Sequence, residues 1–267
     1  MHAMELTLPR SAFTPREVAR AADLWRAFQD LAVGGSSSAG WPPARYREER
    51  VSFIVRAMVV VHHRETVFGE ALRGTTWPSR VQRGVFFRRE GRLAADGAPI
   101  ASATQDWVHV GADLAPVRGS AALLDAFPEQ THEPPVALPA YDRIEGAPAH
   151  AFELECWHTW MDPLAHVNHP AYVGWADEAL ARIAAARGID PCDLAPVAEE
   201  ARFRSGVVAS ERVVVTTRLT GRAGEAAVCA HELATVDGRR VAHLVTVRRL
   251  AAGGDLAALL RDAPPPA

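Results

Sequence analysis

The sequence predicts an α+β protein built twice from one order of elements: a strand, a helix and then four strands. Two observations predict this class. Apolar residues recur at helical spacing once in each half, and β-rich runs separated by turn residues follow each helix. Strands joined by short turns form antiparallel sheets, and each sheet buries its apolar face on the helix of its half. The 267 residues, 48% hydrophobic and 23% charged, suffice for two domains with their own cores.

In the N-terminal half, the run ELTL predicts a short first strand. Thr14 and Glu17 flank a proline and indicate a helix start, because threonine can cap a helix and the glutamate completes a capping box. The buried face of that helix includes Trp25 and Phe28, and the run GGSSSAG ends it. Four β-rich runs follow, beginning with VSFIVRAMVVVHHRE. We expect this half to supply scaffold and an apolar pocket, since its helix start carries no acidic motif.

The C-terminal half repeats this order. The alternating run HAFELECWHTW predicts a half-buried strand, and the turn DPLAHVNHPAY at residues 162–172 follows it. Tyr172 and Trp175 begin the apolar face of the second helix. Four strand-like runs close the half, the last two joined by a hairpin turn at Asp237-Gly238.

These patterns give the expected domain boundaries. The N-terminal domain covers residues 1–125, and the proline-rich stretch 126–147 lacks periodicity and is interpreted as a linker. The C-terminal domain covers residues 148–252. Residues 253–267 form a tail whose last residues, APPPA, are expected to be disordered.

Composition excludes several function classes. A net charge of −3 gives no broad electrostatic basis for binding nucleic acid. No apolar run is long enough to span a bilayer, and the first residues lack the apolar core of a secretory signal. Three widely spaced cysteines do not form a disulfide framework. We therefore expect a cytoplasmic protein.

The turn at residues 162–172 concentrates groups that can do chemistry. Asp162 and His166 precede a helix that starts near Pro170, and Asn168 or His169 is in place to cap it. The unpaired backbone N–H groups of such a helix start can hold an oxyanion, while a carboxylate attacks an activated carbonyl or takes a proton from water. Two interpretations stay open: Asp162 stabilises the turn, as aspartate does in many loops, or it is catalytic.

The turn resembles the loop that carries the active-site aspartate in 4-hydroxybenzoyl-CoA thioesterases. Nearly the whole chain resembles the acyl-ACP thioesterases, which have two hotdog domains in one chain. Their C-terminal domain has the pattern Asp-x-Asn-x-His-Val-Asn-Asn-x-x-Tyr-x-Gly-Trp. The matching residues in this sequence, in order, are Asp162, His166, Val167, Asn168, Tyr172, Gly174 and Trp175. N-terminal motifs of the family resemble the runs FQDLA, RAMVVVHHRE, FGEALRGTTW and ASATQDWV.

The resemblance implies two tandem hotdog domains, each an antiparallel sheet wrapped around a central helix, and hydrolysis of acyl thioesters on acyl carrier protein or coenzyme A. It places the protein in fatty acid biosynthesis and lipid metabolism. Two departures from the family pattern are visible. Leu164 replaces an asparagine, and the strand after the second helix offers only Glu200 as its catalytic glutamate. The catalytic candidates are therefore Asp162, His166 and Glu200, and the substrate-binding candidates are Val167, Asn168, Tyr172, Trp25 and Phe28.

No cofactor is expected, because water is the second reactant, and no metal is expected, because the histidines of this region fit no known site spacing. Cys192 is interpreted as a loop residue. Two other functions remain possible. One is a hotdog enoyl-thioester hydratase or dehydratase, whose aspartate and histidine lie five positions apart, whereas Asp162 and His166 lie four apart. The other is a non-catalytic protein that binds acyl thioesters. The oligomeric state is either a monomeric pseudo-dimer or a homodimer.

Overall fold

The computed structural model describes residues 1–261, and the chain divides into two units. Unit 1 comprises Met1–Ala12 and Asp23–Ala137. Unit 2 comprises Phe13–Ala22 and the chain from Leu138 onward. The short segment 13–22 therefore belongs with the C-terminal unit, although the sequence analysis placed it in the N-terminal domain.

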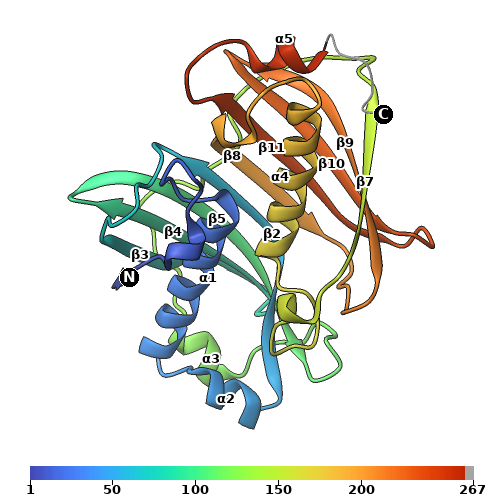
Figure 1. The fold of residues 1–267 in the computed structure, drawn as a ribbon. Helices are drawn as coiled ribbons and strands as arrows, with labels where there is room; N and C mark the ends of the chain where they lie inside the picture. Colours follow the sequence, from blue (N-terminus) through green and yellow to red (C-terminus); the bar gives the residue numbers. More distant parts are fainter. Residues whose placement is uncertain (262–267) are drawn as a thin grey trace. The chain divides into compact units, whose positions relative to one another are not determined.

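Unit 1 is an antiparallel sheet with one long helix (Figure 1). Its strands pair in the order β1-β3-β4-β5-β2, and every pair in this order is antiparallel. The strands are β1 (His2–Leu6), β2 (Val51–His62), β3 (Leu72–Gln82), β4 (Phe86–Ala95) and β5 (Ala98–Gly111). The helices are η1 (Arg10–Ala12), α1 (Ala21–Ser38), which begins at the end of the segment 13–22, α2 (Pro43–Glu48) and α3 (Ala121–Ala126).

Two glycines let α1 approach the sheet closely. A Cβ atom at Gly74 would lie 2.9 Å from a Leu31 methyl group, and one at Gly91 would lie 2.7 Å from the Phe28 ring. Leu31 and Phe28 are completely buried. The helix thus buries its apolar face where β3 and β4 carry no side chain, which is a common reason for glycine inside a strand.

Unit 2 repeats this architecture. Its strands pair in the order β7-β9-β10-β11-β8, all antiparallel, and β6 adds to the edge of β9. The strands are β6 (Asp142–Arg143), β7 (Ala149–Glu155), β8 (Leu194–Phe203), β9 (Arg212–Ala223), β10 (Ala226–Thr235) and β11 (Arg240–Leu250). The helices are η2 (His158–Trp160), α4 (Pro170–Ala185), η3 (Pro191–Asp193) and α5 (Leu256–Arg261). With the two-residue strand β6 set aside, the first strand of each unit pairs with the third and the second pairs with the fifth, so the predicted duplicated α+β fold is confirmed.

The chain before α1 differs from the prediction. The Thr14 N–H donates to the Val18 carbonyl at 2.9 Å, and the Glu17 N–H donates to the Thr14 carbonyl at 2.9 Å. Glu17 has a φ of 59°, and the helix begins only at Ala21. Thr14 and Glu17 therefore form a tight loop and no capping box, because Glu17 in the left-handed region cannot belong to a helix.

Part of the predicted linker is fastened to the sheet of unit 1. The Gln130 N–H donates to the Pro78 carbonyl at 2.8 Å, and the Val136 N–H donates to the Thr104 hydroxyl at 2.8 Å. Between them, Arg92 pairs with Glu133 at 2.7 Å. We call residues 129–136 the strap. The strap forms no helix or strand, as its lack of sequence periodicity predicts. Its hydrogen bonds nevertheless hold it in one defined path across the strands.

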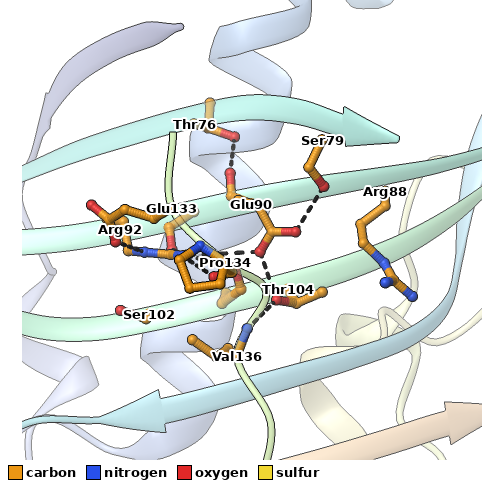
Figure 2. A network of polar contacts seen from close by, with 12 residues as sticks. Thr76, Ser79, Arg88, Glu90, Arg92, Ser102, Thr104, Glu133, Pro134 and Val136 are labelled. Carbon is orange, nitrogen blue, oxygen red and sulfur yellow. Dashed lines mark hydrogen bonds and ion pairs between the residues drawn. The ribbon is translucent and has the colours of Figure 1, made fainter. Parts of the chain in front are cut away.

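The strap lies over a buried carboxylate (Figure 2). Glu90 is completely buried and accepts hydrogen bonds from the hydroxyls of Thr104 at 2.6 Å and Ser79 at 2.8 Å. Arg92 approaches it at 3.8 Å. The Thr104 hydroxyl therefore joins the buried carboxylate to the strap, since it donates to one and accepts from the other.

The predicted tail, 253–267, begins with an ordered element. Helix α5 buries Leu256, Ala257 and Leu260 in a cluster with Leu180 of α4. The residues expected to be disordered, APPPA, lie outside the described range. No helix within residues 1–261 is both long enough and apolar enough to span a membrane.

Candidate active site

The turn before α4 holds Asp162 in a closed loop. The Asp162 N–H donates to the His166 carbonyl at 2.8 Å, and the Ala165 N–H donates to the Asp162 carbonyl at 3.0 Å. Ala165 adopts a φ of 61°, which is costly for a residue with a Cβ atom. Such strain at a surface loop is a feature of functional sites.

The two oxygens of the Asp162 carboxylate have different surroundings. Oδ1 accepts the Leu164 N–H at 2.8 Å. Oδ2 lies 3.6 Å from His166 Nε2, at ion-pair distance but too far for a hydrogen bond. The side chains of Asp162 and His166 are 13% and 24% exposed. One oxygen therefore holds the turn, and the other faces the His166 imidazole.

His166 is held by the chain that follows β8. A Cβ atom at Gly206 would lie 3.2 Å from the His166 Cβ atom, so a glycine leaves the room that His166 needs. Arg239 fixes this segment by donating to the Gly206 carbonyl at 2.7 Å and by pairing with Glu211. Sequence reasoning missed Gly206 and Arg239, because neither lies near the turn in the sequence.

Several backbone N–H groups at the start of α4 already have partners within the protein. The Val167 N–H donates to the Val207 carbonyl at 2.8 Å, and the Asn168 N–H donates to the Trp160 carbonyl at 2.9 Å. Pro170 has no N–H, and the Tyr172 N–H donates to the His169 carbonyl at 3.2 Å. His169 occupies the N-cap without a side-chain cap hydrogen bond. The N–H groups of Val167 and Asn168 are therefore occupied by carbonyl groups of the protein in this structure.

Tyr172 lies beneath the turn. It is 2% exposed, and its ring contacts the rings of Trp175 and Phe203 at centroid distances of 4.8 and 5.3 Å. Burial raises the pKa of the Tyr172 phenol well above its usual range, although a hydrogen bond with the Val207 backbone opposes the shift. Tyr172 is thus a neutral, packed support of the loop.

Glu200 lies on the wrong face of its strand. It points away from α4 and pairs with Arg202 at 2.6 Å. The preceding residue, Glu199, is completely buried and pairs with Arg248, which also pairs with Asp177 of α4 at 2.7 Å. A shift of one residue reverses the face of a strand. Glu200 therefore lies on the face opposite α4, and Glu199 is part of a buried ion network.

Trp25 and Phe28 lie on the buried face of α1, and both are completely buried. The structure places them in unit 1, whereas Asp162 and His166 belong to unit 2. Cys192 lies in η3, where partial burial and the Asp190 carboxylate raise the pKa of its thiol. A thiol so disposed is a poor nucleophile. Within residues 1–261, no group of three or more histidine, cysteine or acidic side chains is arranged to hold a metal ion.

The segment 13–22, which precedes α1, contains a copy of the Asp162 loop without its acid. In both copies the first residue and the fifth close the loop, from Thr14 N–H to the Val18 carbonyl at 2.9 Å and from Asp162 N–H to the His166 carbonyl at 2.8 Å. The fourth residue of each copy has a positive φ, 59° at Glu17 and 61° at Ala165. Thr14 therefore stands in the position of Asp162 and cannot act as a carboxylate.

Comparisons with known proteins agree with this fold. Residues 156–261 match the family model described as Thioesterase-like superfamily. A Lactobacillus plantarum protein assigned as an oleoyl thioesterase superposes with a TM-score of 0.78 at 14% identity, covering 93% of this chain and 95% of its own. The 12:0-ACP thioesterase of Umbellularia californica gives 0.75 at 15% identity, covering 93% and 94%. An acyl-ACP thioesterase from Bacteroides thetaiotaomicron gives 0.71 at 12%, covering 93% and 97%.

A comparison with curated protein sequences finds no significant match. The chain has the tandem hotdog fold of these structures, and its residues 156–261 have the sequence pattern of the Thioesterase-like superfamily. The predicted fold is thus confirmed.

Proposed function

We propose that the protein hydrolyses acyl thioesters to a free acid and a thiol. The observation that carries this proposal is the Asp162 carboxylate: one of its oxygens accepts no backbone hydrogen bond within residues 1–261 and lies near His166. This oxygen either removes a proton from water as the water adds to the thioester carbonyl, or attacks that carbonyl itself. In both routes the carbon–sulfur bond breaks, the thiol departs with a proton, and water supplies the oxygen of the acid.

We further propose acyl phosphopantetheine thioesters as the substrate class, with coenzyme A or acyl carrier protein as carrier and cytoplasmic fatty acid metabolism as the setting. The likeness to proteins named as acyl-ACP and oleoyl thioesterases supports this class. Trp25 and Phe28 provide the apolar surface for the acyl chain, and Tyr172 supports the catalytic loop from below.

The experiment compares hydrolysis of decanoyl- and palmitoyl-coenzyme A by the wild type and Asp162→Asn, with the released thiol detected. Asparagine keeps the side-chain oxygen that accepts the Leu164 N–H, but it cannot accept a proton from water at neutral pH. Turnover falls at least about 100-fold if the carboxylate is the base or nucleophile, because general base catalysis contributes that much. The melting temperature changes little, since asparagine replaces aspartate in such turns at little cost.

Asp190→Asn is the matched control. Asp190 also precedes a proline and also accepts the N–H two residues later, that of Cys192, at 2.9 Å. It shares these two features and lacks the histidine, so its substitution leaves turnover unchanged. Equal turnover in the wild type and Asp162→Asn refutes the carboxylate mechanism. Hydration of an enoyl thioester without hydrolysis identifies the hydratase, and binding without either reaction identifies a non-catalytic protein.

A further inference from the structure

Unit 2 has a hollow on the side of its sheet that faces away from α4. The hollow has a volume of about 840 Å³, within the range of small-molecule sites. It lies over β8, β10 and β11, which are neighbours in the sheet (Figure 1). Its lining residues are Glu200, Arg202, Arg204, Glu232, Leu233, Ala234, Gly238, Arg240, His243 and Val245. We call this hollow the outer groove.

The charges of the outer groove do not cancel. Arg202 pairs with Glu200 at 2.6 Å, and His243 pairs with Glu232 at 2.8 Å. Arg204 and Arg240 have no side-chain ion pair or hydrogen bond within residues 1–261, and both are exposed. Both carboxylates that line the groove are thus already paired, and the guanidinium groups of Arg204 and Arg240 are available to bind an anion. Guanidinium is the side chain best suited to phosphate, because it donates two parallel hydrogen bonds.

The floor of the groove is apolar between these charges. Val245 pairs with Glu200 in the β11–β8 register, and Ala234 pairs with Arg240 in the β10–β11 register. Val245 and Ala234 are half-buried and small, so a flat ring can lie against them while phosphates reach the arginines. A ligand with a planar, weakly polar ring and phosphate groups matches this distribution.

One end of the groove adjoins the candidate active site. Arg204 is two residues before Gly206, and Gly206 lies against His166, since a Cβ atom added to Gly206 would lie 3.2 Å from the His166 Cβ atom. Only one residue separates Arg204, whose guanidinium is unpaired, from Gly206, which contacts the catalytic loop. A substrate whose thioester lies at Asp162 can extend over this segment into the groove.

We propose that the outer groove binds the phosphate-bearing nucleotide end of a coenzyme A thioester, with Arg204 and Arg240 holding the phosphates. The inference rests on the proposed function and names its carrier. The concave shape favours a small molecule over an acyl carrier protein, because a protein partner needs a broad surface of roughly 800 Å² on each side.

The first test measures binding of adenosine 3′,5′-bisphosphate by calorimetry and needs no catalysis. The double variant Arg204→Gln/Arg240→Gln binds at least tenfold more weakly than the wild type. Arg202→Gln is the matched control, because Arg202 lies on the same strand and face but is already paired with Glu200. The control binds within about threefold of the wild type, since a paired surface arginine contributes little free charge. Absence of binding to the wild type, or equal binding by the double variant, overturns the proposal.

The second test compares three substrates in the folded variants. The double variant raises KM for decanoyl-coenzyme A at least tenfold without changing kcat, and it leaves hydrolysis of S-decanoyl-N-acetylcysteamine, which lacks the nucleotide, unchanged. An equal loss with decanoyl-acyl carrier protein overturns the proposal in favour of a protein carrier. If no substrate is hydrolysed by the wild type, the proposed function fails, while the bisphosphate measurement still decides whether the groove binds a nucleotide.

Discussion

Replacing Thr104 with valine removes one hydroxyl that makes two hydrogen bonds. The hydroxyl donates to the buried Glu90 carboxylate at 2.6 Å and accepts the strap N–H of Val136 at 2.8 Å. A hydrogen bond to a charged group contributes about 1.5–3 kcal/mol and a neutral one about 0.5–1.5 kcal/mol. Since valine has nearly the same shape, the expected loss in the free energy of unfolding is about 2–4 kcal/mol. For a protein of this size, that lowers Tm by roughly 5–15 °C.

The assay combines thermal unfolding with amide hydrogen exchange. The Thr104→Val variant melts earlier, and peptides that contain residues 129–136 exchange faster than in the wild type, because the strap has lost one of its bonds to the sheet. Thr75→Val is the matched control: Thr75 lies on β3, is partly exposed, and has no side-chain hydrogen bond within the described residues. If the two variants melt at the same temperature, or if exchange of the strap is unchanged, the Thr104 hydroxyl does not join the strap to Glu90.

Three other substitutions test the core and the site. Burial, aided by the charge of Arg248, lowers the pKa of His231 from 6.5 to about 3. Unfolding lets His231 take up a proton, so the free energy of unfolding falls as pH drops from 6.5 toward 3, by about 2 kcal/mol at pH 5. Urea unfolding of His231→Gln lacks this pH-dependent loss. Gly206→Ala pushes on His166 and lowers kcat several-fold with little change in Tm; unchanged kcat contradicts this positioning. Trp25→Ala enlarges the apolar pocket and shifts chain-length preference toward longer acyl thioesters, at a cost of about 3–5 kcal/mol in stability; a folded variant with unchanged preference places the pocket elsewhere.

The sequence was sufficient for the architecture because each element has its own local signal. Helical spacing in α1 and α4 and turn residues between the strands predicted both sheets, and the same order in each half predicted the duplication. The family pattern brought Asp162 and His166 together before the structure did. The family pattern could not identify residues whose roles depend on contacts that are distant in the sequence, such as the contact of Gly206 with His166.

Two errors have physical causes. Glu199 and Glu200 are equivalent in composition, and only the pairing register decides which of them faces α4. Thr14 and Glu17 have the spacing of a capping box, but a left-handed residue at position 17 turns the same letters into a loop. The spacing of Thr14 and Glu17 alone cannot distinguish a capping box from a tight loop, because both arrangements satisfy the hydrogen bonds of the local backbone. The strap was also hidden, since its order comes from Arg92 and Thr104 of the sheet.

The paired loops at Thr14 and Asp162 have a consequence for how such a chain evolves. A homodimer has one gene for both loops, so any substitution appears in both sites at once. A chain with two tandem domains encodes the two loops separately. The loop at Thr14 can therefore lose its acid while the loop at Asp162 keeps it. On the proposed function, each polypeptide then has one turnover centre, and a reagent that traps the acyl group there saturates at one equivalent per chain. The copy at Thr14, which has no carboxylate in the position of Asp162, is free of the constraint that such a centre imposes.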